Sequence, residues 1–212
     1  MKTAIVSDNR LEARELQCIR DDRVLFENLS FDVCSAQVLL LEGANGCGKT
    51  SLLRILCGIR MQDQGDVAWN GENIDKLGSN YYGIMAYVGH MDGVKRELTV
   101  EENLNMARAL GSKTAITSAQ ALEQVDLAGY QPVRTQGLSA GQKRRLALAR
   151  LLVTENALWV LDEPFTALDQ NGILRVEHLI QAHTHKGGMV VMTSHHQVHL
   201  NDVEVIQINL SS

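Results

Sequence analysis

Two patterns of apolar and polar residues divide the chain. Between residues 16 and 41, short apolar runs alternate with polar pairs that favour turns, namely Asp21-Asp22 and Glu27-Asn28. A further short run at residues 65–71 ends in Asn-Gly, a dipeptide typical of tight hairpin turns. These patterns predict an antiparallel sheet in the first part of the chain.

The second pattern is helical and begins near residue 98. Residues 98–127 carry apolar positions at helical spacing, Thr99 and Glu102 have the spacing of a capping box, and a second helix is predicted at residues 119–127. Beyond residue 138, predicted helices at 140–153 and 172–183 alternate with predicted strands at 158–161 and 189–193. Because a parallel sheet needs helical crossovers between its strands, this order predicts an α/β core.

Composition narrows the class of protein. The 212 residues suffice for one domain with a substantial core, and 45% apolar against 21% charged residues is an ordinary globular balance. A net charge of −5 argues against binding to nucleic acid. No segment has the length of a signal-peptide core or a spanning helix, and the four cysteines lack metal-binding spacing. We therefore expect a single cytosolic unit with reduced cysteines.

A glycine-rich segment lies between an apolar run at residues 38–41 and a predicted helix at residues 51–59. Its glycines allow the backbone to direct several N–H groups into one concavity at a helix start, which binds phosphate oxygens. Lys49 would reach the β- and γ-phosphates of a nucleoside triphosphate, and Thr50 would offer its hydroxyl to Mg²⁺. The predicted nucleotide-binding residues are Gly43, Ala44, Asn45, Gly46, Cys47, Gly48, Lys49, Thr50 and Ser51.

Cys47 lies within this segment, beside Lys49 and at a helix start, where a thiolate is favoured. Alkylation of such a thiolate would block nucleotide binding. The alternative interpretation is a small side chain that only fills the loop.

Two carboxylates follow the buried strand predicted at residues 158–161. Ligands of α/β sheets gather at the carboxyl ends of the strands, so Asp162 and Glu163 are expected beside the phosphate loop. Asp162 would hold Mg²⁺ through water, and Glu163 would face the γ-phosphate and polarise the attacking water. The pair therefore predicts hydrolysis of the bound nucleotide.

The segment Leu138-Ser139-Ala140-Gly141-Gln142 resembles the LSGGQ signature of the ABC ATPases, with Ala140 in place of the first glycine. A hydroxyl and small residues at a helix start form an anion site. The resemblance implies ATP as the nucleotide and a homodimer in the ATP-bound state. It also implies that Ser139, Ala140, Gly141 and Gln142 bind the γ-phosphate of the ATP held by the phosphate loop of a second copy.

Two further segments match the family in order. Residues 166–169 resemble the D-loop, which places Asp169 at the nucleotide site of the dimer, and His195 resembles the switch histidine that binds the γ-phosphate. The neighbouring histidines leave another interpretation open, because His195-His196-x-x-His199 and His183-x-His185 have the composition of metal or haem sites. The alternative treats the histidines other than His195 as solvated residues near helix ends.

Two departures from the general pattern narrow the resemblance. His90 stands in the Q-loop position, where most ABC ATPases carry glutamine, and the resemblance gives it a catalytic role. A neutral imidazole accepts a hydrogen bond there and an imidazolium does not, so ATPase activity is expected to fall in acid. Arg20 stands where an aromatic residue usually stacks on adenine, and its guanidinium plane can stack instead. Residues 86–99, together with the signature and the segment around Asp162, resemble the ATP-binding subunits of cytochrome c maturation haem exporters.

This resemblance spans nearly the whole chain and implies its architecture. We expect an α/β fold with a P-loop NTPase core built on a parallel sheet, a flanking antiparallel β subdomain and a helical subdomain. Residues 1–85 and 154–212 would form the core with the antiparallel part. Residues 90–153 would form the Q-loop, helical subdomain and signature helix of this single ABC ATPase domain, which spans residues 1–212.

The implied function is that of a peripheral protein on the cytoplasmic face of the bacterial inner membrane, bound to integral membrane subunits of a haem-handling complex. With ATP and Mg²⁺, it would energise haem export or haem-chaperone release in c-type cytochrome biogenesis. Another cargo stays open, because cargo choice resides in the partner. A soluble ABC machine is disfavoured by the single cassette without a coiled-coil insertion, and a small-molecule kinase by the signature and the lack of an acceptor-binding lid.

Overall fold

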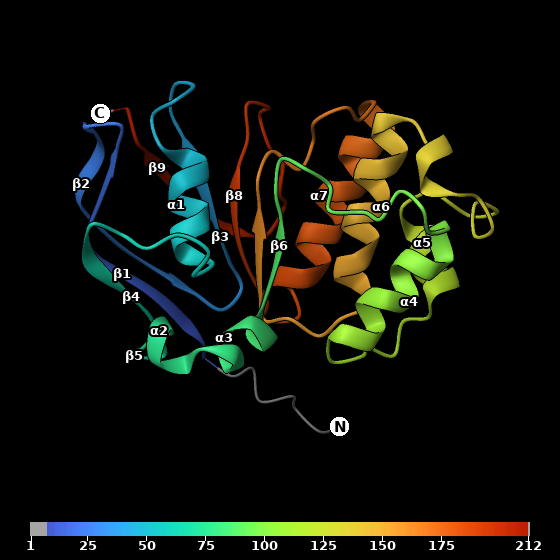
Figure 1. Cartoon of the computed structure of the whole chain (residues 1–212), viewed down its shortest axis with the longest axis horizontal. Coiled ribbons are helices and arrows are strands. Elements are labelled where there is room, and N and C mark those ends of the chain that lie inside the picture. Colours follow the sequence, from blue (N-terminus) through green and yellow to red (C-terminus); the bar gives the residue numbers. More distant parts are fainter. Residues whose placement is uncertain (1–7, 212) are drawn as a thin grey trace.

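The computed structural model describes residues 8–211, which form two β-sheets and a group of helices (Figure 1). The strands are β1 (Arg10–Arg20), β2 (Arg23–Cys34), β3 (Gln37–Glu42), β4 (Gln64–Trp69), β5 (Glu72–Asn73), β6 (Met85–Val88), β7 (Leu158–Leu161), β8 (Met189–Thr193) and β9 (Glu204–Asn209). The helices are α1 (Lys49–Leu56), α2 (Ile74–Leu77), α3 (Ser79–Ile84), α4 (Val100–Leu110), α5 (Ser118–Gln124), α6 (Ala140–Leu152), α7 (Gln170–Thr184) and the 3-10 turn η1 (Thr135–Gly137).

The two sheets differ in kind. One is antiparallel with the strand order β2-β1-β4-β5, and the other is parallel with the order β6-β7-β8-β3-β9. Both predicted sheets are therefore confirmed. β6 continues the parallel sheet as far as Val88, and the predicted division of the domain stays a prediction.

The parallel strands separate two apolar cores. On β3, Val38 and Leu40 contribute to the core shared with α4 to α7, whereas Leu39 and Leu41 contribute to the core shared with α1 and the antiparallel sheet. Successive side chains of a strand point to opposite faces, so a strand covered on both faces is apolar at every position. This explains the unbroken apolar run before the phosphate loop. Figure 1 shows the same layers, with α6 and α7 on one side of the sheet and α1 on the other.

One predicted turn is wrong. Glu27 and Asn28 lie inside β2, where Asn28 has a φ of 53° and the pairing with β1 shifts register. The feature is a β-bulge, which a short polar residue such as asparagine tolerates in the left-handed region. The predicted turn at Asp21-Asp22 is confirmed, since these residues connect β1 to β2.

The helices differ from prediction mainly at their ends. The capping box of Thr99 and Glu102 is confirmed at the start of α4. α5 spans Ser118–Gln124 rather than residues 119–127, and a second capping box at Thr117 begins it. α1 ends at Leu56 instead of residue 59, because Gly58, with a φ of 65°, follows in a left-handed conformation that ends a helix. α6 and α7 occupy the predicted segments to within two residues.

None of the helices within residues 8–211 combines the length and the apolar character that crossing a membrane requires.

Candidate functional site

The loop between β3 and α1 has a backbone that only its glycines allow. Gly48 has a φ of 111°, and a Cβ at this position would lie 3.0 Å from the ring of Phe26. Lys49 begins α1, and its Nζ donates hydrogen bonds to the carbonyl oxygens of Gly43 at 2.6 Å and Ala44 at 3.2 Å. The ammonium group thus lies across the loop, beside the N-terminal N–H groups of α1.

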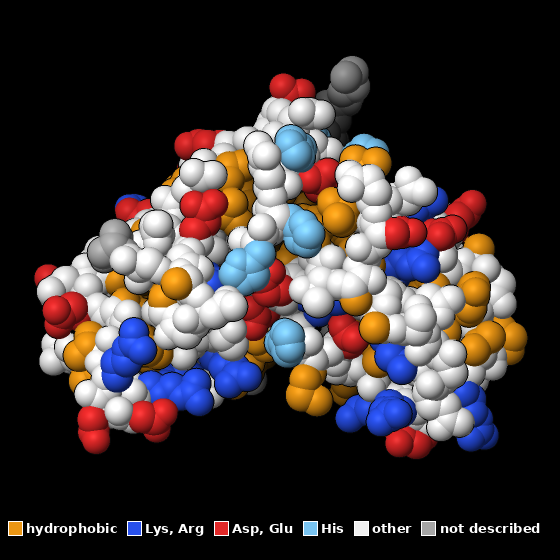
Figure 2. Space-filling view, turned by 90° about the horizontal axis from the view of Figure 1, so that it is seen from above, with side chains coloured by type: hydrophobic (Ala, Val, Ile, Leu, Met, Phe, Trp, Pro, Cys, Tyr) orange, Lys and Arg blue, Asp and Glu red, His pale blue; other side chains and the backbone are white. Residues whose placement is uncertain are grey.

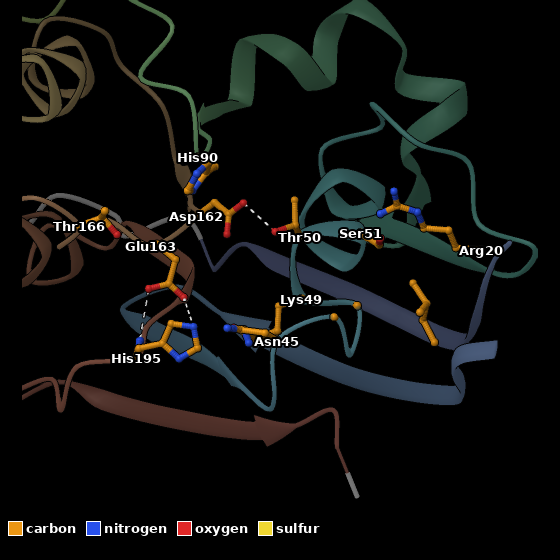
Figure 3. Close-up of a pocket in the computed structure, with 13 residues that line it drawn as sticks. Arg20, Asn45, Lys49, Thr50, Ser51, His90, Asp162, Glu163, Thr166 and His195 are labelled. Atoms are coloured by element: carbon orange, nitrogen blue, oxygen red, sulfur yellow. Dashed lines mark hydrogen bonds and ion pairs between the residues drawn. The ribbon is translucent and has the colours of Figure 1, made fainter. Parts of the chain in front are cut away.

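A pocket of about 440 Å³ opens over this loop (Figure 3). It is lined by Arg20, Leu25, Asn45, Gly46, Gly48, Lys49, Thr50, Ser51, His90, Asp162, Glu163, Thr166 and His195. The structure therefore brings together most residues that the sequence nominated, from five separate segments of the chain. On the face seen in Figure 2, acidic and histidine side chains gather near the centre. Leu25 and Thr166 were not predicted as site residues.

Arg20 lies at the opposite end of the pocket from His195 (Figure 3). Its side chain is 65% exposed, and its Nε lies 3.5 Å from Oδ2 of Asp21. Leu25 is the apolar side chain of the lining. The planar guanidinium at this end is suited to stacking on a nucleobase.

Asp162 is the buried carboxylate of the site and is 3% exposed. Its Oδ2 accepts a hydrogen bond from Thr50 Oγ1 at 2.9 Å, and its Oδ1 accepts one from Thr193 Oγ1 at 2.9 Å. A carboxylate and a hydroxyl facing each other beside a phosphate loop are the hard oxygen ligands that suit Mg²⁺. The residues present therefore fit this ion. Thr193 was missed, although a hydroxyl residue at the end of an apolar strand shortly before His195 is the signal for it.

Glu163 lines the pocket and its carboxylate contacts His195. Its Oε1 lies 3.3 Å from His195 Nε2, and its Oε2 accepts a hydrogen bond from the His195 backbone N–H at 3.3 Å (Figure 3). Glu163 has a φ of 53°, and its own N–H donates to Thr193 Oγ1 at 2.8 Å. His90 lines the pocket near Asp162, so the three predicted catalytic residues face one cavity.

The signature segment does not line this pocket. Ser139 and Gln142 form a capping box that begins α6, and Ser139 and Ala140 are exposed. A Cβ at Gly141 would lie 2.6 Å from the carbonyl oxygen of Ala167, which explains why glycine stands there while the preceding position accepts alanine. The predicted γ-phosphate contact of residues 139–142 stays a prediction.

Four other predicted nucleotide residues also lie outside the lining. Gly43, Ala44 and Cys47 belong to the same loop, and Ala44 donates its N–H to Ser211 Oγ at 2.7 Å. Asp169 caps α7, where its Oδ1 accepts a hydrogen bond from Gly172 N–H at 2.8 Å. Their contact with nucleotide stays a prediction.

The remaining histidines do not gather into a metal centre within the described residues. No group of three or more histidine, cysteine, aspartate or glutamate side chains there is placed to hold a metal ion. His199 donates its N–H to Glu177 Oε1 at 2.8 Å, and His185 Nε2 lies 3.3 Å from the carbonyl oxygen of Asp202. His183 is packed against Trp159.

The sequence of this chain is similar to a known protein family and to named relatives. A family model described as "ABC transporter" matches residues 26–166. The cytochrome c biogenesis ATP-binding export protein CcmA of Nitrosomonas europaea is 46% identical over 203 residues, which cover 95% of each chain. The protein of the same name from Hahella chejuensis is 47% identical over 206 residues, covering 95% of this chain and 96% of that one.

Solved structures show the same fold. An ABC transporter ATP-binding protein from Pyrococcus furiosus superposes with a TM-score of 0.81 at 27% identity, covering 95% of this chain and 97% of that chain. A dimeric bacterial ABC transporter cassette superposes with a TM-score of 0.81 at 19% identity, covering 94% of both chains. At the lower identity the likeness concerns the fold alone.

Proposed function

Because the chain belongs to the ABC transporter family, we propose that it is the ATP-hydrolysing subunit of a membrane complex that serves c-type cytochrome biogenesis. The fold by itself would leave the activity open. The activity is supported by the pocket, in which a phosphate loop, a buried carboxylate and the Glu163–His195 pair share one cavity. The process is supported by the relatives named as cytochrome c biogenesis export proteins.

ATP binds with its phosphates in the loop at residues 43–50. Lys49 leaves the carbonyl oxygens of Gly43 and Ala44 and neutralises the β- and γ-phosphates, while the N–H groups at the start of α1 donate to phosphate oxygens. Thr50 and Asp162 would hold Mg²⁺, which supplies positive charge against the phosphate oxygens. The base lies at the Arg20 end of the pocket, because the phosphate loop occupies the other.

Glu163 orients and polarises the attacking water. Its carboxylate is 17% exposed and is oriented by two contacts with His195, one from the ring and one from the backbone N–H. His195 is 55% exposed in the single chain and is placed to contact the γ-phosphate. His90 takes the position beside the phosphates that an amide usually holds, and its neutral ring accepts a hydrogen bond there.

A second copy of the chain completes the site. Ser139 and Ala140 are exposed at the positive end of α6, yet they do not reach the pocket of their own chain. In a head-to-tail homodimer, residues 139–142 of each copy contact the γ-phosphate bound by the other copy, and Asp169 lies at the same interface. ATP then stabilises the closed dimer, and hydrolysis releases it.

Integral membrane subunits are the other partners, and the chain is peripheral on the cytoplasmic face of the inner membrane. Exposed apolar side chains that could make such a contact are Ile59, Met61, Tyr82 and Met91, which are between 55% and 85% exposed. Met91 follows His90, so a partner that binds it contacts the loop of a pocket residue. In this complex the output is haem export or the release of a haem chaperone.

The single observation that carries the activity is the position of Glu163 in the phosphate pocket. Glu163→Gln is expected to bind ATP as the native chain does, to lose turnover by at least about a hundredfold, and to accumulate as an ATP-bound dimer. The matched control is Glu155→Gln, since Glu155 lies outside this pocket. Brisk hydrolysis by the Glu163 variant would refute its assigned role.

The proposed role in c-type cytochrome biogenesis is tested separately, by deleting the gene and measuring the c-type cytochromes that carry haem. The native gene should restore them, whereas the gene carrying Glu163→Gln should not. Full c-type cytochrome assembly in the deletion strain would point to another cargo for the same ATPase.

A further inference from the structure

Arg144 is a charged side chain buried in the interior of the site, on the second turn of α6. The residue is 3% exposed, and a charged side chain is rarely buried to this degree unless all its groups are paired. Here its guanidinium meets five acceptors from two other segments: the carbonyl oxygens of Asp162 at 2.6 Å, Glu163 at 2.8 Å, Pro164 at 3.3 Å and Gly89 at 2.8 Å, and Oδ1 of Asp92 at 3.2 Å.

The first consequence concerns the backbone of Glu163. A φ of 53° is rare for a residue with a side chain, and such a conformation persists only where its surroundings hold it. Arg144 Nη2 donates to the carbonyl oxygens on both sides of this φ angle, those of Asp162 and Glu163. From the other side, Thr193 Oγ1 accepts the Glu163 N–H. The direction of the Glu163 carboxylate therefore depends on these two neighbours.

The second consequence concerns the loop that carries His90. Nη1 of Arg144 donates to the carbonyl oxygen of Gly89 and pairs with Asp92, so its two contacts bracket His90. Arg150, further along α6, donates to the carbonyl oxygens of Asp92 at 3.3 Å and Gly93 at 3.1 Å. The guanidinium that contacts the Glu163 backbone is therefore also bonded to the loop that carries His90.

We propose that Arg144 is a positioning residue for ATP hydrolysis, which holds Glu163 in its hydrolytic conformation and links that conformation to the His90 loop. The inference rests on the proposed function, since it takes Glu163 as the residue that polarises water. Arginine is required because its planar fork offers five N–H donors, whereas the ammonium of lysine offers three from a single point. The positive charge of a lysine ammonium would not by itself satisfy acceptors that belong to two separate segments of the chain.

The test compares the same substitution at two adjacent residues of α6. Arg145 is the matched control, because it pairs with Asp126 Oδ2 at 2.7 Å outside the pocket. In the complete chain, Arg144→Lys should lower kcat about 30-fold or more with KM for ATP within about twofold, since misplacing a catalytic group by about 1 Å costs about a hundredfold. Arg145→Lys should change neither. A kcat for Arg144→Lys within about threefold of the native value overturns the inference.

A second pair of variants tests the same proposal if Arg144→Lys does not fold. Asp92 is 24% exposed at the outer end of the guanidinium, and Asp92→Asn keeps its shape while removing the ion pair. We expect kcat to fall about fivefold at unchanged KM, and Asp126→Asn, which breaks the Arg145 pair instead, to hydrolyse ATP normally. Equal turnover by the two asparagine variants overturns the inference.

A double-mutant cycle separates positioning from a general structural role. If Arg144 acts through Glu163, then adding Arg144→Lys to Glu163→Gln should slow the residual single-turnover hydrolysis by less than about threefold. A further loss as large as that in the native background overturns the inference. The proposed function fails separately: in that case Glu163→Gln itself hydrolyses ATP briskly. If Glu163→Gln is inactive while Arg144→Lys and Asp92→Asn are fully active, only the positioning role is wrong.

Discussion

Acidification is expected to weaken the fold through one half-buried histidine. His183 lies near the end of α7, where its ring stacks on the indole of Trp159 with ring centroids 3.8 Å apart and an interplanar angle of 6°. The same ring packs so closely on Gly188 that a Cβ there would collide with it. Desolvation of the ring, together with the positive charge of nearby Lys186, lowers the pKa of His183 to about 4.

The sign and size of the effect follow from this pKa. An imidazole in the unfolded chain has a pKa near 6.5, so between pH 6.5 and 4 the unfolded chain binds a proton that the native chain excludes. Stability is therefore complete above pH 6.5 and falls as the pH drops through this window. At about 1.4 kcal/mol per pKa unit, the loss reaches about 3 kcal/mol near pH 4. This is a substantial part of the roughly 5–15 kcal/mol that stabilises a typical domain.

The assay is urea unfolding between pH 7.0 and 4.5, followed by circular dichroism in the native chain and in His183→Phe. Phenylalanine keeps a flat ring against Trp159 but binds no proton, while the carboxylates, including Glu155 in the same cavity, are common to both proteins. Between pH 7.0 and 4.5 the native chain should therefore lose about 2.5 kcal/mol more unfolding free energy than His183→Phe. His185→Phe, an exchange at an exposed histidine, should leave the native slope unchanged. Parallel curves for the native chain and His183→Phe would refute the reasoning.

Three further substitutions test individual contacts. Gly141→Ala brings a methyl group to 2.6 Å from the carbonyl oxygen of Ala167, so it should cost about 1–3 kcal/mol in urea unfolding and slow ATP hydrolysis. Thr193→Val removes the hydroxyl that donates to Asp162 and should destabilise the chain by about 1–3 kcal/mol and lower kcat, whereas Thr193→Ser should retain both; equal values for the two variants would contradict this role. Thr99→Ala removes the cap of α4 and should cost about 1 kcal/mol in thermal unfolding while nucleotide affinity, measured by calorimetry, stays unchanged.

The features that were predicted correctly from the sequence are those whose pattern lies within a short stretch of contiguous residues. The phosphate loop, the strand before Asp162 and the capping box at Thr99 each depend on spacing within about ten residues. The proximity of the residues that follow these strands was also predictable. β3, β7 and β8 are neighbours in one parallel sheet, and parallel strands end at the same edge. Lys49, Asp162 and His195 therefore face one pocket although they are far apart in the chain.

What sequence did not predict depends on side chains that meet only in the fold. Nothing local distinguishes Arg144 from the adjacent Arg145, yet one is buried among five acceptors and the other pairs with Asp126. The bulge at Asn28 has the composition of a turn, and only its pairing with β1 identifies it as part of a strand. In both cases a local pattern fits two structures, and long-range contacts select one of them.

The position of Arg144 also explains how one helix serves two parts of the site. Ser139 caps α6 at its exposed N-terminus, and Arg144 follows on the second turn, where its side chain holds the backbone of Glu163. Because α6 is a continuous helix of 13 residues, these two points keep a fixed separation. A contact that moves Ser139 must therefore move the support of Glu163 as well, unless the intervening hydrogen bonds break. The Arg144 and Asp92 variants test the Arg144 end of this link, since each changes the support of Glu163 without substituting any side chain that lines the pocket.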